Sequence, residues 1–396
     1  MCQDVSPDST GIYKVMPLEN VPRLFMKDLR NDPMMPSLDE LRRSGFPMRF
    51  FDEDIIAPRK SNSGTPSEAL AEVFQVQANI IKGGLVLTFL GQHQAMDGVG
   101  QNQVMNLLSK ACKGEAFSHK ELIIGNQARE NIIPLLGPSW EPGPELAHNI
   151  VKHDLQQTGP GSGEVRMPYD KGTWCHFEFS HTALSMLKSQ ATSTRPAATT
   201  YISTDDTISA FVWQAIIRAR IARYSLDTKA KVARAVDLRR YLDVPSTYPG
   251  FVQSMTYHDL TMHEALNHSL GEIAAMFRTE LEAENPGLGY YGRSLATLID
   301  RTPDKKRISL IAGFDMAKDV MINSWANQNS YELDFGLELG VPEAVRRPRF
   351  DGFQGLVYLL PRKKTGDVGV AICLSSDDME RLTKDEEFNS FATYVG

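Results

Sequence analysis

The stretch Leu85-Val-Leu-Thr-Phe-Leu-Gly-Gln-His93-Gln-Ala-Met-Asp97-Gly98 decides the fold of this 396-residue chain, because in it a strand pattern changes to a helix pattern. Residues 73–81 also read as a strand, and Lys82-Gly-Gly84 between the two segments predicts a hairpin turn. After Gly98 the apolar residues recur at helical spacing, at Val104, Leu107, Leu108 and Ala111. The sequence therefore predicts a β-hairpin that runs directly into a helix, with His93 at the junction.

The rest of the chain alternates between strand and helix patterns, which predicts a mixed α/β protein. The segment 155–172 is rich in Gly, Pro and Ser and predicts a linker between a first domain, 1–154, and a second domain, 173–396. Helices are expected after Ser180 and after Ser203, both of a residue type that caps helix N-termini. Further strands are expected at 173–180, 230–240, 308–313, 353–360 and 367–374, and a polar helix is expected at 376–390.

Composition excludes several classes of protein. The chain has 42 Lys and Arg against 49 Asp and Glu, and its net charge of −7 argues against nucleic acid or an anionic membrane as the main partner. The apolar runs are too short to span a bilayer, and no leader-like segment follows Met1, so the cytoplasm is the expected location. The four cysteines include no CxxC pair and no metal spacing, so neither a disulfide framework nor a metal site is expected.

His93 is the strongest candidate for a catalytic residue. The end of a strand projects a side chain beyond the sheet, and imidazole can take a proton near neutral pH. In this HxxxDG pattern, Asp97 is expected to hold the bend between strand and helix, and Gly98 to supply backbone angles closed to other residues. The alternative is that His93 is an ordinary, partly buried histidine.

A second candidate feature is the charged segment Val236-Asp-Leu-Arg-Arg240 within a predicted strand. The strand period of two places Asp237 and Arg239 on the same face. If that face is buried, Arg239 needs a partner, and Asp97 would serve. The alternative is a solvated edge strand.

Several other patterns have ordinary interpretations. Asp334-Phe-Gly336 lacks the other motifs of a kinase and predicts a turn. Gly287-Leu-Gly-Tyr-Tyr-Gly292 follows no apolar strand, which argues against a dinucleotide site. The pair Lys363-Lys364 is expected to be a solvated hairpin tip. No GxSxG motif is present to supply a serine nucleophile.

Taken together and in order, these segments resemble the BAHD acyltransferases, in particular the fungal branch of trichothecene 3-O-acetyltransferase-like proteins. The resemblance rests on HxxxDG, the Val-Asp-x-Arg segment and a Trp…Asp-Phe-Gly block, and it covers nearly the whole chain. Collinear support comes from Asp54-Ile-Ile-Ala-Pro-Arg59, Ile80-Ile-Lys-Gly-Gly-Leu85, Leu107-Leu-Ser-Lys-Ala-Cys112, Pro342-Glu-Ala-Val-Arg-Arg-Pro348 and Val370-Ala-Ile-Cys373.

The resemblance implies two chloramphenicol-acetyltransferase-like domains with mixed β-sheets and a channel between them. It implies that His93 is the general base for transfer of an acyl group from acyl-CoA, expected to be acetyl-CoA, to a hydroxyl of a fungal secondary metabolite. Transfer would be direct, without an acyl-enzyme and without a metal. Asp97, Gly98, Arg239, Asp334 and Gly336 would be structural, and Ser203 and Thr204 would contact coenzyme A. A cytoplasmic monomer is expected, with coenzyme A and a small-molecule acceptor as its partners.

The sequence also departs from the family pattern. Leu337 stands where plant members have a second Trp, and Asn327 stands where acid-binding members have an Arg, so a carboxylate acceptor is disfavoured. Family members usually carry further elements before the equivalent of Ile12, and the comparison predicts a first domain shortened at its start. Two alternatives stay open: the same fold catalysing N-acylation or a CoA-independent cyclisation, and an inactive ligand-binding homologue.

Overall fold

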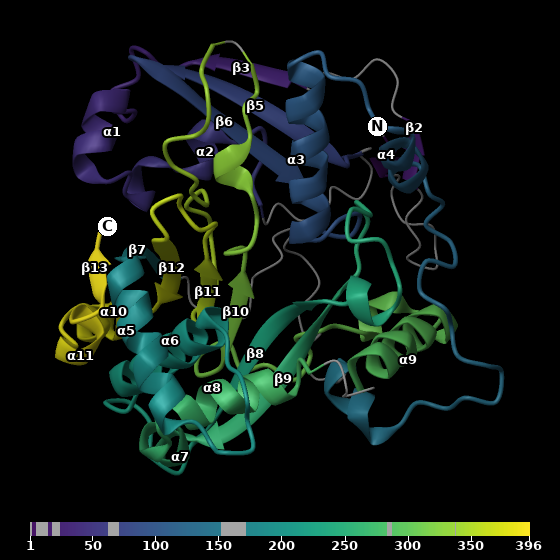
Figure 1. The fold of residues 1–396 in the computed structure, drawn as a ribbon, viewed down its shortest axis with the longest axis vertical. Helices are drawn as coiled ribbons and strands as arrows, with labels where there is room; N and C mark the ends of the chain where they lie inside the picture. The colour runs from purple at the N-terminus through teal and green to yellow at the C-terminus, as the bar shows by residue number, and fades with distance from the viewer. Residues whose placement is uncertain are drawn as a thin grey trace, which may run out of the picture.

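The fold is described by a computed structural model covering residues 2–4, 15–17, 24–61, 71–151, 172–282, 287–336 and 338–396. Two sheets lie at opposite ends of the molecule, one built from early residues and one from late residues (Figure 1). A third, small sheet has the order β2-β1-β4, formed by Val15–Pro17, Cys2–Asp4 and Ala71–Glu72.

The first sheet has the order β3-β5-β6 and contains the hairpin expected from the sequence. β5 (Phe74–Ile81) and β6 (Gly84–Gly91) are antiparallel, while β3 (Leu24–Asp28) runs parallel to β5. Helix α3 (Gly98–Cys112) packs on this sheet, and Val104 and Leu108 contact a core that includes Phe74. The other helical elements of this half are α1 (Leu38–Ser44), η1 (Met48–Phe50), α2 (Glu53–Ile56), α4 (His119–Gly125) and η2 (Pro144–Asn149).

The second sheet has seven strands in the order β13-β7-β12-β11-β10-β8-β9. The strands are β7 (Thr173–Phe179), β8 (Lys229–Asp237), β9 (Gln253–Thr261), β10 (Val320–Ser324), β11 (Leu356–Leu359), β12 (Val368–Leu374) and β13 (Ala392–Tyr394). β10 is parallel to both β8 and β11, and the remaining pairs are antiparallel. The sheet is therefore mixed, as expected.

Helices cover one face of the seven-stranded sheet (Figure 1). The helical elements of this half are α5 (His181–Thr194), α6 (Thr204–Arg220), η4 (Arg239–Tyr241), α7 (Met262–Asn267), α8 (Leu270–Thr279), α9 (Gly287–Arg301), η5 (Lys305–Arg307), η6 (Ser330–Glu332), α10 (Ser376–Thr383) and α11 (Glu386–Asn389). α6 is almost wholly buried and is the centre of the largest core. The opposite face carries a separate core rich in Met and aromatic residues, including Trp174, Met255, Phe350 and Tyr358.

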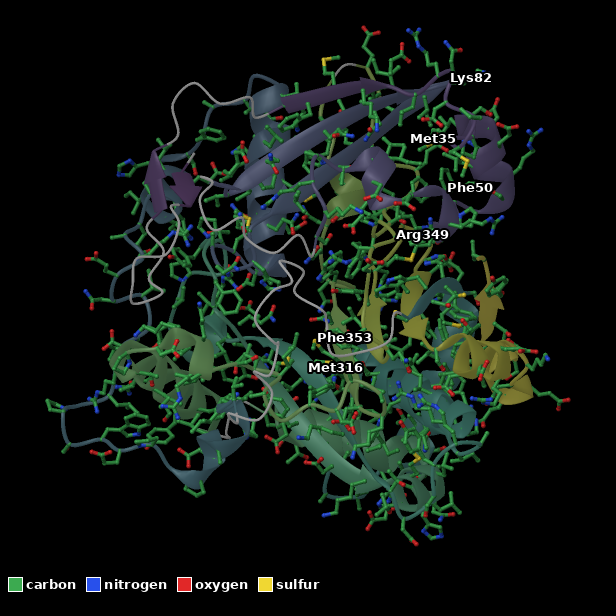
Figure 2. The ribbon with its side chains drawn as sticks, turned by 180° about the vertical axis from the view of Figure 1, so that it is seen from behind. Met35, Phe50, Lys82, Met316, Arg349 and Phe353 are labelled. Atoms are coloured by element: carbon green, nitrogen blue, oxygen red, sulfur yellow. The ribbon has the colours of Figure 1, made fainter. Side chains whose placement is uncertain are left out.

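One segment, residues 325–350, leaves the seven-stranded sheet, crosses to the first sheet and returns (Figure 1). On the way out, the Asn329 side chain bonds to Asn106 of α3, and Phe335 stacks on Phe89 at 5.1 Å. On the way back, Glu343 accepts from Arg42 of α1 at 2.8 Å. Arg349 then pairs with Asp52, between the two halves of the molecule (Figure 2). The two halves are therefore joined by more than the chain between them.

Most of the expected strands form, with three corrections. Residues 308–313 form no strand; Ile308 makes a single bridge to Ile150 and turns follow. The strand expected at 230–240 ends at Asp237, because the chain then enters the short turn of η4. The terminal helix is divided into α10 and α11, with Asp385 capping the second. The linker at 155–172 lies almost entirely outside the described residues, so the division into domains stays a proposal.

In the described part of the chain, no helix is long and apolar enough to cross a membrane. Over the same residues, no group of His, Cys, Asp or Glu side chains is arranged to hold a metal ion.

Two buried histidines predict a loss of stability in acid. Burial lowers the pKa of both His176 and His258 to about 4, against 6.5 for the exposed side chain. The unfolded chain therefore binds more protons between these pH values, and the free energy of unfolding falls as pH drops from about 6.5 to about 4. Each histidine contributes at most about 3 kcal/mol to this loss. Urea unfolding across this range measures it, and His258→Gln should flatten the dependence. The exposed His119→Gln is the control, and equal slopes for the two variants would contradict the assignment.

Candidate active site

His93 lies in the turn between β6 and α3 and is exposed. Its ring contacts Phe251 at 5.6 Å between centroids and at 58° between planes. The turn is held at both of its ends: the backbone N–H groups of Ala95 and Met96 donate to the carbonyl of Gln92, and Arg129 donates to the carbonyl of Ala95 at 2.6 Å. The imidazole therefore stands free on a backbone that is fixed, and the alternative of a partly buried histidine is wrong.

Asp97 holds the end of this turn against the other half of the molecule. It is the N-cap of α3, and its Oδ1 accepts from the backbone N–H of Gly100 at 2.8 Å. Its Oδ2 accepts from the N–H of Val252 at 2.7 Å. Two further bonds, of 3.0 and 3.1 Å, come from the guanidinium of Arg239. All the acceptor positions of the carboxylate are thus used for structure, and none is directed at His93.

Arg239 is buried, with 1 % of its side chain exposed, which excludes the solvated edge strand. Besides Asp97, its guanidinium donates to Asp237 and to the carbonyls of Tyr248 and Gly250. Burial alone would lower the pKa of Arg239, but the hydrogen bonds and charges of the two aspartates outweigh it, so the pKa is raised. The guanidinium of Arg239 therefore stays charged. The expected Asp97–Arg239 pair forms, although Arg239 lies just beyond the strand and not within it.

Two glycines let the segments approach closely. A Cβ at Gly100 would lie 2.3 Å from the carbonyl oxygen of Pro249, and a Cβ at Gly98 would lie 2.9 Å from Nε1 of Trp325. Gly98 does not adopt a left-handed backbone, so the sequence-based reason given for it was wrong. Its role is to make room for the indole.

A pocket of about 70 Å³ lies where these segments meet. It is bordered by the start of α3, the ends of β8 and β10, and the start of β9. Its lining residues are Asp97, Gly98, Val99, Ala235, Val236, Asp237, Gln253, Asn323, Ser324, Trp325 and Gln328. Sequence reasoning missed the polar members Gln253, Asn323 and Gln328, because no motif connects them.

Asp334 and Gly336 lie at the far end of α3. The Asp334 side chain accepts from the N–H of Gly336 at 2.8 Å, and its carbonyl accepts from the Ser109 hydroxyl at 2.6 Å. Gly336 has φ of 75° and lies close to the carbonyl of Cys112. These contacts make a turn against the C-terminal end of the helix, away from the His93 turn, whereas Leu337 lies outside the described residues.

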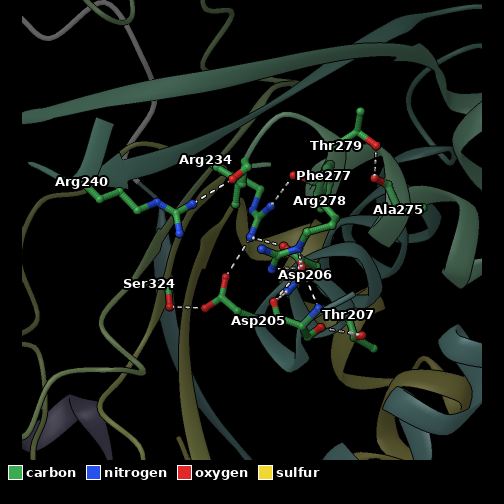
Figure 3. Close-up of polar contacts among 12 residues, drawn as sticks. Asp205, Asp206, Thr207, Arg234, Arg240, Ala275, Phe277, Arg278, Thr279 and Ser324 are labelled. Atoms are coloured by element: carbon green, nitrogen blue, oxygen red, sulfur yellow. Dashed lines mark hydrogen bonds and ion pairs between the residues drawn. The ribbon is translucent and has the colours of Figure 1, made fainter. Parts of the chain in front are cut away.

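Ser203 and Thr204 lie at the N-terminus of α6. Ser203 forms a capping box with Asp206, and its hydroxyl both donates to that carboxylate and accepts from its N–H. Asp206 is buried between Arg234 and Arg278 (Figure 3). Burial would raise the pKa of Asp206, but the two arginines and Ser203 lower it overall. The Ser203 hydroxyl is therefore already engaged, and Thr204 is the freer of the two.

The α6 N-terminus is also tied to the central pocket. Asp205 accepts from Arg234 at 2.8 Å and from the hydroxyl of Ser324, which lines that pocket (Figure 3). The structure thus brings together the His93 turn, Asp97, Gly98 and Arg239. Ser203 and Thr204 lie at the edge of this group, connected to the central pocket through Asp205 and Ser324. Asp334 and Gly336 are not part of this group.

A second pocket, of about 270 Å³, lies beyond the end of β10. Its lining residues are Ala326, Asn327, Gln328, Asn329, Tyr331, Glu332, Arg362, Lys363 and Lys364. Lys363 pairs with Glu178 at 2.7 Å, so it is not the solvated tip that the sequence suggested, whereas Lys364 is exposed. Three cations thus converge on one cavity from the β11–β12 hairpin.

Comparisons with known proteins agree with this arrangement. The model of the Transferase family matches residues 59–389, and the model of the trichothecene 3-O-acetyltransferase-like N-terminal domain matches residues 1–112. The chain therefore belongs to the Transferase family. Its relatives make it an acyltransferase of the trichothecene 3-O-acetyltransferase-like branch, as the sequence motifs predicted.

Three relatives illustrate the similarity. An O-acetyltransferase from Cryptosporiopsis sp. is 44% identical, with 100% of this chain and 85% of that protein covered. The trichothecene 3-O-acetyltransferase of Fusarium sporotrichioides is 43% identical, with 100% and 84% covered. The crystal structure of the F. graminearum enzyme with coenzyme A and deoxynivalenol has a TM-score of 0.92 at 42% identity and covers 100% of this chain and 88% of that one. The two-domain mixed α/β fold is thereby confirmed.

Proposed function

We propose that this protein transfers an acetyl group from acetyl-CoA to a hydroxyl of a small secondary metabolite, with His93 as the general base. The observation that carries the proposal is an exposed imidazole on a turn that is locked by a buried ion pair at a pocket between the two sheets. The relatives support it, since they are O-acetyltransferases, and crystal structures of the Fusarium enzymes hold coenzyme A together with T-2 or deoxynivalenol.

In this proposal one imidazole nitrogen of His93 takes the proton of the acceptor hydroxyl. Acetyl-CoA supplies the acyl group as an activated thioester. Asp97 does not act on the imidazole, because its oxygens are bound to Arg239, Gly100 and Val252. The side chains of Asp97 and Arg239 instead keep the His93 turn in one position. A general base needs a fixed position to contact the hydroxyl of a bound acceptor. The acceptor oxygen attacks the thioester carbonyl, the C–S bond breaks, and the departing coenzyme A thiolate takes the proton from the imidazole, so transfer is direct, without a covalent acyl-enzyme.

The basic pocket fits the phosphate groups of coenzyme A. Arg362, Lys363 and Lys364 border one cavity, and Gln328 lies in the lining of both this pocket and the central one. If these cations hold a phosphate of acetyl-CoA, the thioester end of the same molecule would lie near the start of α3. At the α6 N-terminus, Asp205 and Asp206 oppose an anion, so Thr204 would contact an uncharged part of the molecule.

Lys364→Ala should raise the KM for acetyl-CoA by about tenfold, because a charge-assisted contact to phosphate is lost. The effect should shrink with 3′-dephospho-acetyl-CoA if the lysine binds that phosphate, and should persist if it binds the diphosphate. Lys82→Ala is the matched control, a lysine at the exposed turn of the other hairpin. An unchanged KM in Lys364→Ala would contradict this placement of the coenzyme.

The proposed function is tested by calorimetry with acetyl-CoA and by release of free thiol with hydroxylated acceptors such as deoxynivalenol. Binding of acetyl-CoA with acceptor-dependent thiol release supports the proposal, and absence of heat with acetyl-CoA and with CoA contradicts it. Release with amines but not alcohols would indicate N-acylation. Consumption of an acceptor without CoA would indicate cyclisation, and CoA-dependent heat without turnover would indicate an inactive homologue.

We further propose that the enzyme works as a monomer in the cytoplasm. The net charge of −7 and the free thiols of Cys112, Cys175 and Cys373 support this. Size-exclusion chromatography with light scattering tests the monomer, and fractionation of the producing cells tests the location.

A further inference from the structure

Arg347, on the returning part of the crossing segment, lies in a cage of three aromatic rings. Its Cζ is 5.3 Å from the ring centroid of Trp325, 4.7 Å from that of Phe350 and 4.5 Å from that of Tyr358. All three distances are within the range of a cation–π interaction. Trp325 and Phe350 lie at the two ends of the crossing segment and Tyr358 lies in β11, so the cage exists only in the folded protein.

The guanidinium of Arg347 has no hydrogen bond or ion pair to any residue that the structure describes, and its Nε is buried without a partner. Its neighbours along the chain behave differently. Arg346 donates to the carbonyls of Phe46 and Gly45, and Arg349 pairs with Asp52. Buried donors are almost always bonded in folded proteins, so an arginine held in this way retains its donors for something outside the chain.

The cage adjoins the central pocket through one ring. The Trp325 side chain lines that pocket and touches the start of α3 at Gly98. Tyr358 is the registered neighbour of Asn323, another lining residue. The indole of Trp325 therefore lies between Arg347 and the start of α3, the helix that follows the His93 turn. Arg347 lies on the Met- and aromatic-rich face of the seven-stranded sheet.

The chemistry of the cage selects a type of ligand atom. A guanidinium donates through a planar fork of N–H groups, which matches an oxygen whose lone pairs lie in a plane, as in a ketone or a carboxylate. The surrounding rings are uncharged and favour flat apolar carbon around that oxygen. A hydroxyl oxygen accepts a hydrogen bond but lacks this planar arrangement, so an alcohol matches the fork less well than a ketone or a carboxylate.

We propose that Arg347 determines acceptor specificity by donating hydrogen bonds to a carbonyl-type oxygen, of a ketone or a carboxylate, carried on a cyclic acceptor beside the hydroxyl that is acetylated. This inference rests on the proposed acetyl transfer and adds the chemical class of its acceptor. Arg347, near the far end of the crossing segment, also places a cation beside Trp325, where Asn327 supplies none.

The test compares two fused-ring alcohols that differ in one ketone, hydroxytetralone and tetralol, with a hydroxytetralin carboxylic acid as a third probe. Efficiency is measured as kcat/KM from thiol release with acetyl-CoA, and affinity of the CoA-loaded protein is measured by calorimetry. The variants are Arg347→Met, which keeps the apolar contact, and Arg347→Lys, which keeps the charge but not the fork. Arg346→Met is the matched control, because among the described residues its guanidinium donates to backbone carbonyls and to no side chain.

The wild type should prefer hydroxytetralone or the acid over tetralol by about tenfold, and Arg347→Met should reduce that ratio to near one. Arg347→Lys should retain a preference for the acid only, and Arg346→Met should keep the wild-type ratio even if its melting temperature falls. Equal treatment of the three probes by the wild type, in turnover and in binding, overturns the inference, as does an unchanged ratio in Arg347→Met. Neither result contradicts the proposed function. That function fails only if acetyl-CoA is not bound or if no acceptor causes release of thiol from acetyl-CoA.

Discussion

His93→Ala lowers kcat/KM for acetyl transfer by about 10²–10⁴-fold, the amount that a positioned general base contributes. This is the expected result, because no hydrogen bond or ion pair among the described residues joins the His93 ring to another imidazole or to a carboxylate. Asp97 lies nearby but has no free acceptor position. The measurement is acceptor-dependent release of thiol from acetyl-CoA.

The variant should fold normally, since the side chain is exposed and, within the part of the chain that the structure describes, its ring contacts Phe251. A change in the free energy of unfolding within about 0.5 kcal/mol is expected. The affinity for acetyl-CoA should stay close to that of the wild type, so that the loss falls on kcat. His119→Ala, at the exposed start of α4, is the matched control and should retain full activity. Retention of more than a tenth of the activity by His93→Ala would refute the role of base.

Arg239→Met should lower the free energy of unfolding by about 3–5 kcal/mol, the usual effect of removing one member of a buried ion pair. The reason is that Asp97, with 2 % of its side chain exposed, would be left as a buried charge without its main partner. The carbonyls of Tyr248 and Gly250 would also lose their donor. Urea unfolding of the purified variant measures the change.

The matched control is Asp237→Asn, which alters the same guanidinium from its exposed side. That carboxylate is 39 % exposed, so the expected loss is at most about 1 kcal/mol. The double variant Asp97→Asn with Arg239→Met should be less destabilised than the sum of the single variants, because the uncompensated charge disappears. Equal losses in Arg239→Met and Asp237→Asn would show that the buried pair is not what holds the turn.

Local patterns predicted the parts of the fold that depend on local sequence. The β5–β6 hairpin and the helix after it follow from alternating and then helical spacing, and the capping box of Ser203 was visible in four residues. The strand expected at 308–313 was wrong because a short apolar run has no periodicity that distinguishes a strand from a buried turn. The Val320–Ser324 strand went unnoticed for the same reason.

The site could be predicted only where one motif or one charge requirement defined it. Arg239 needed a partner if buried, and this led to Asp97 across 142 positions of sequence. The basic pocket and the Arg347 cage could not be found in this way. Each is assembled from segments whose proximity depends on the sheet order and on the path of residues 325–350, neither of which is encoded at any single position.

The path of residues 325–350 has a consequence for how the molecule is made. Ser109 bonds to Asp334, which lies 225 positions later in the chain, and Arg42 bonds to Glu343, which lies 301 positions later. At a synthesis rate of about 5–20 residues per second, these positions emerge from the ribosome on the order of tens of seconds apart. During that interval Phe89 of β6 lacks the ring of Phe335, and the polar side chains of α3 lack Asn329 and Asp334. Contacts between residues so far apart in sequence form slowly. Newly made chains should therefore depend on chaperones until the last quarter has been synthesised.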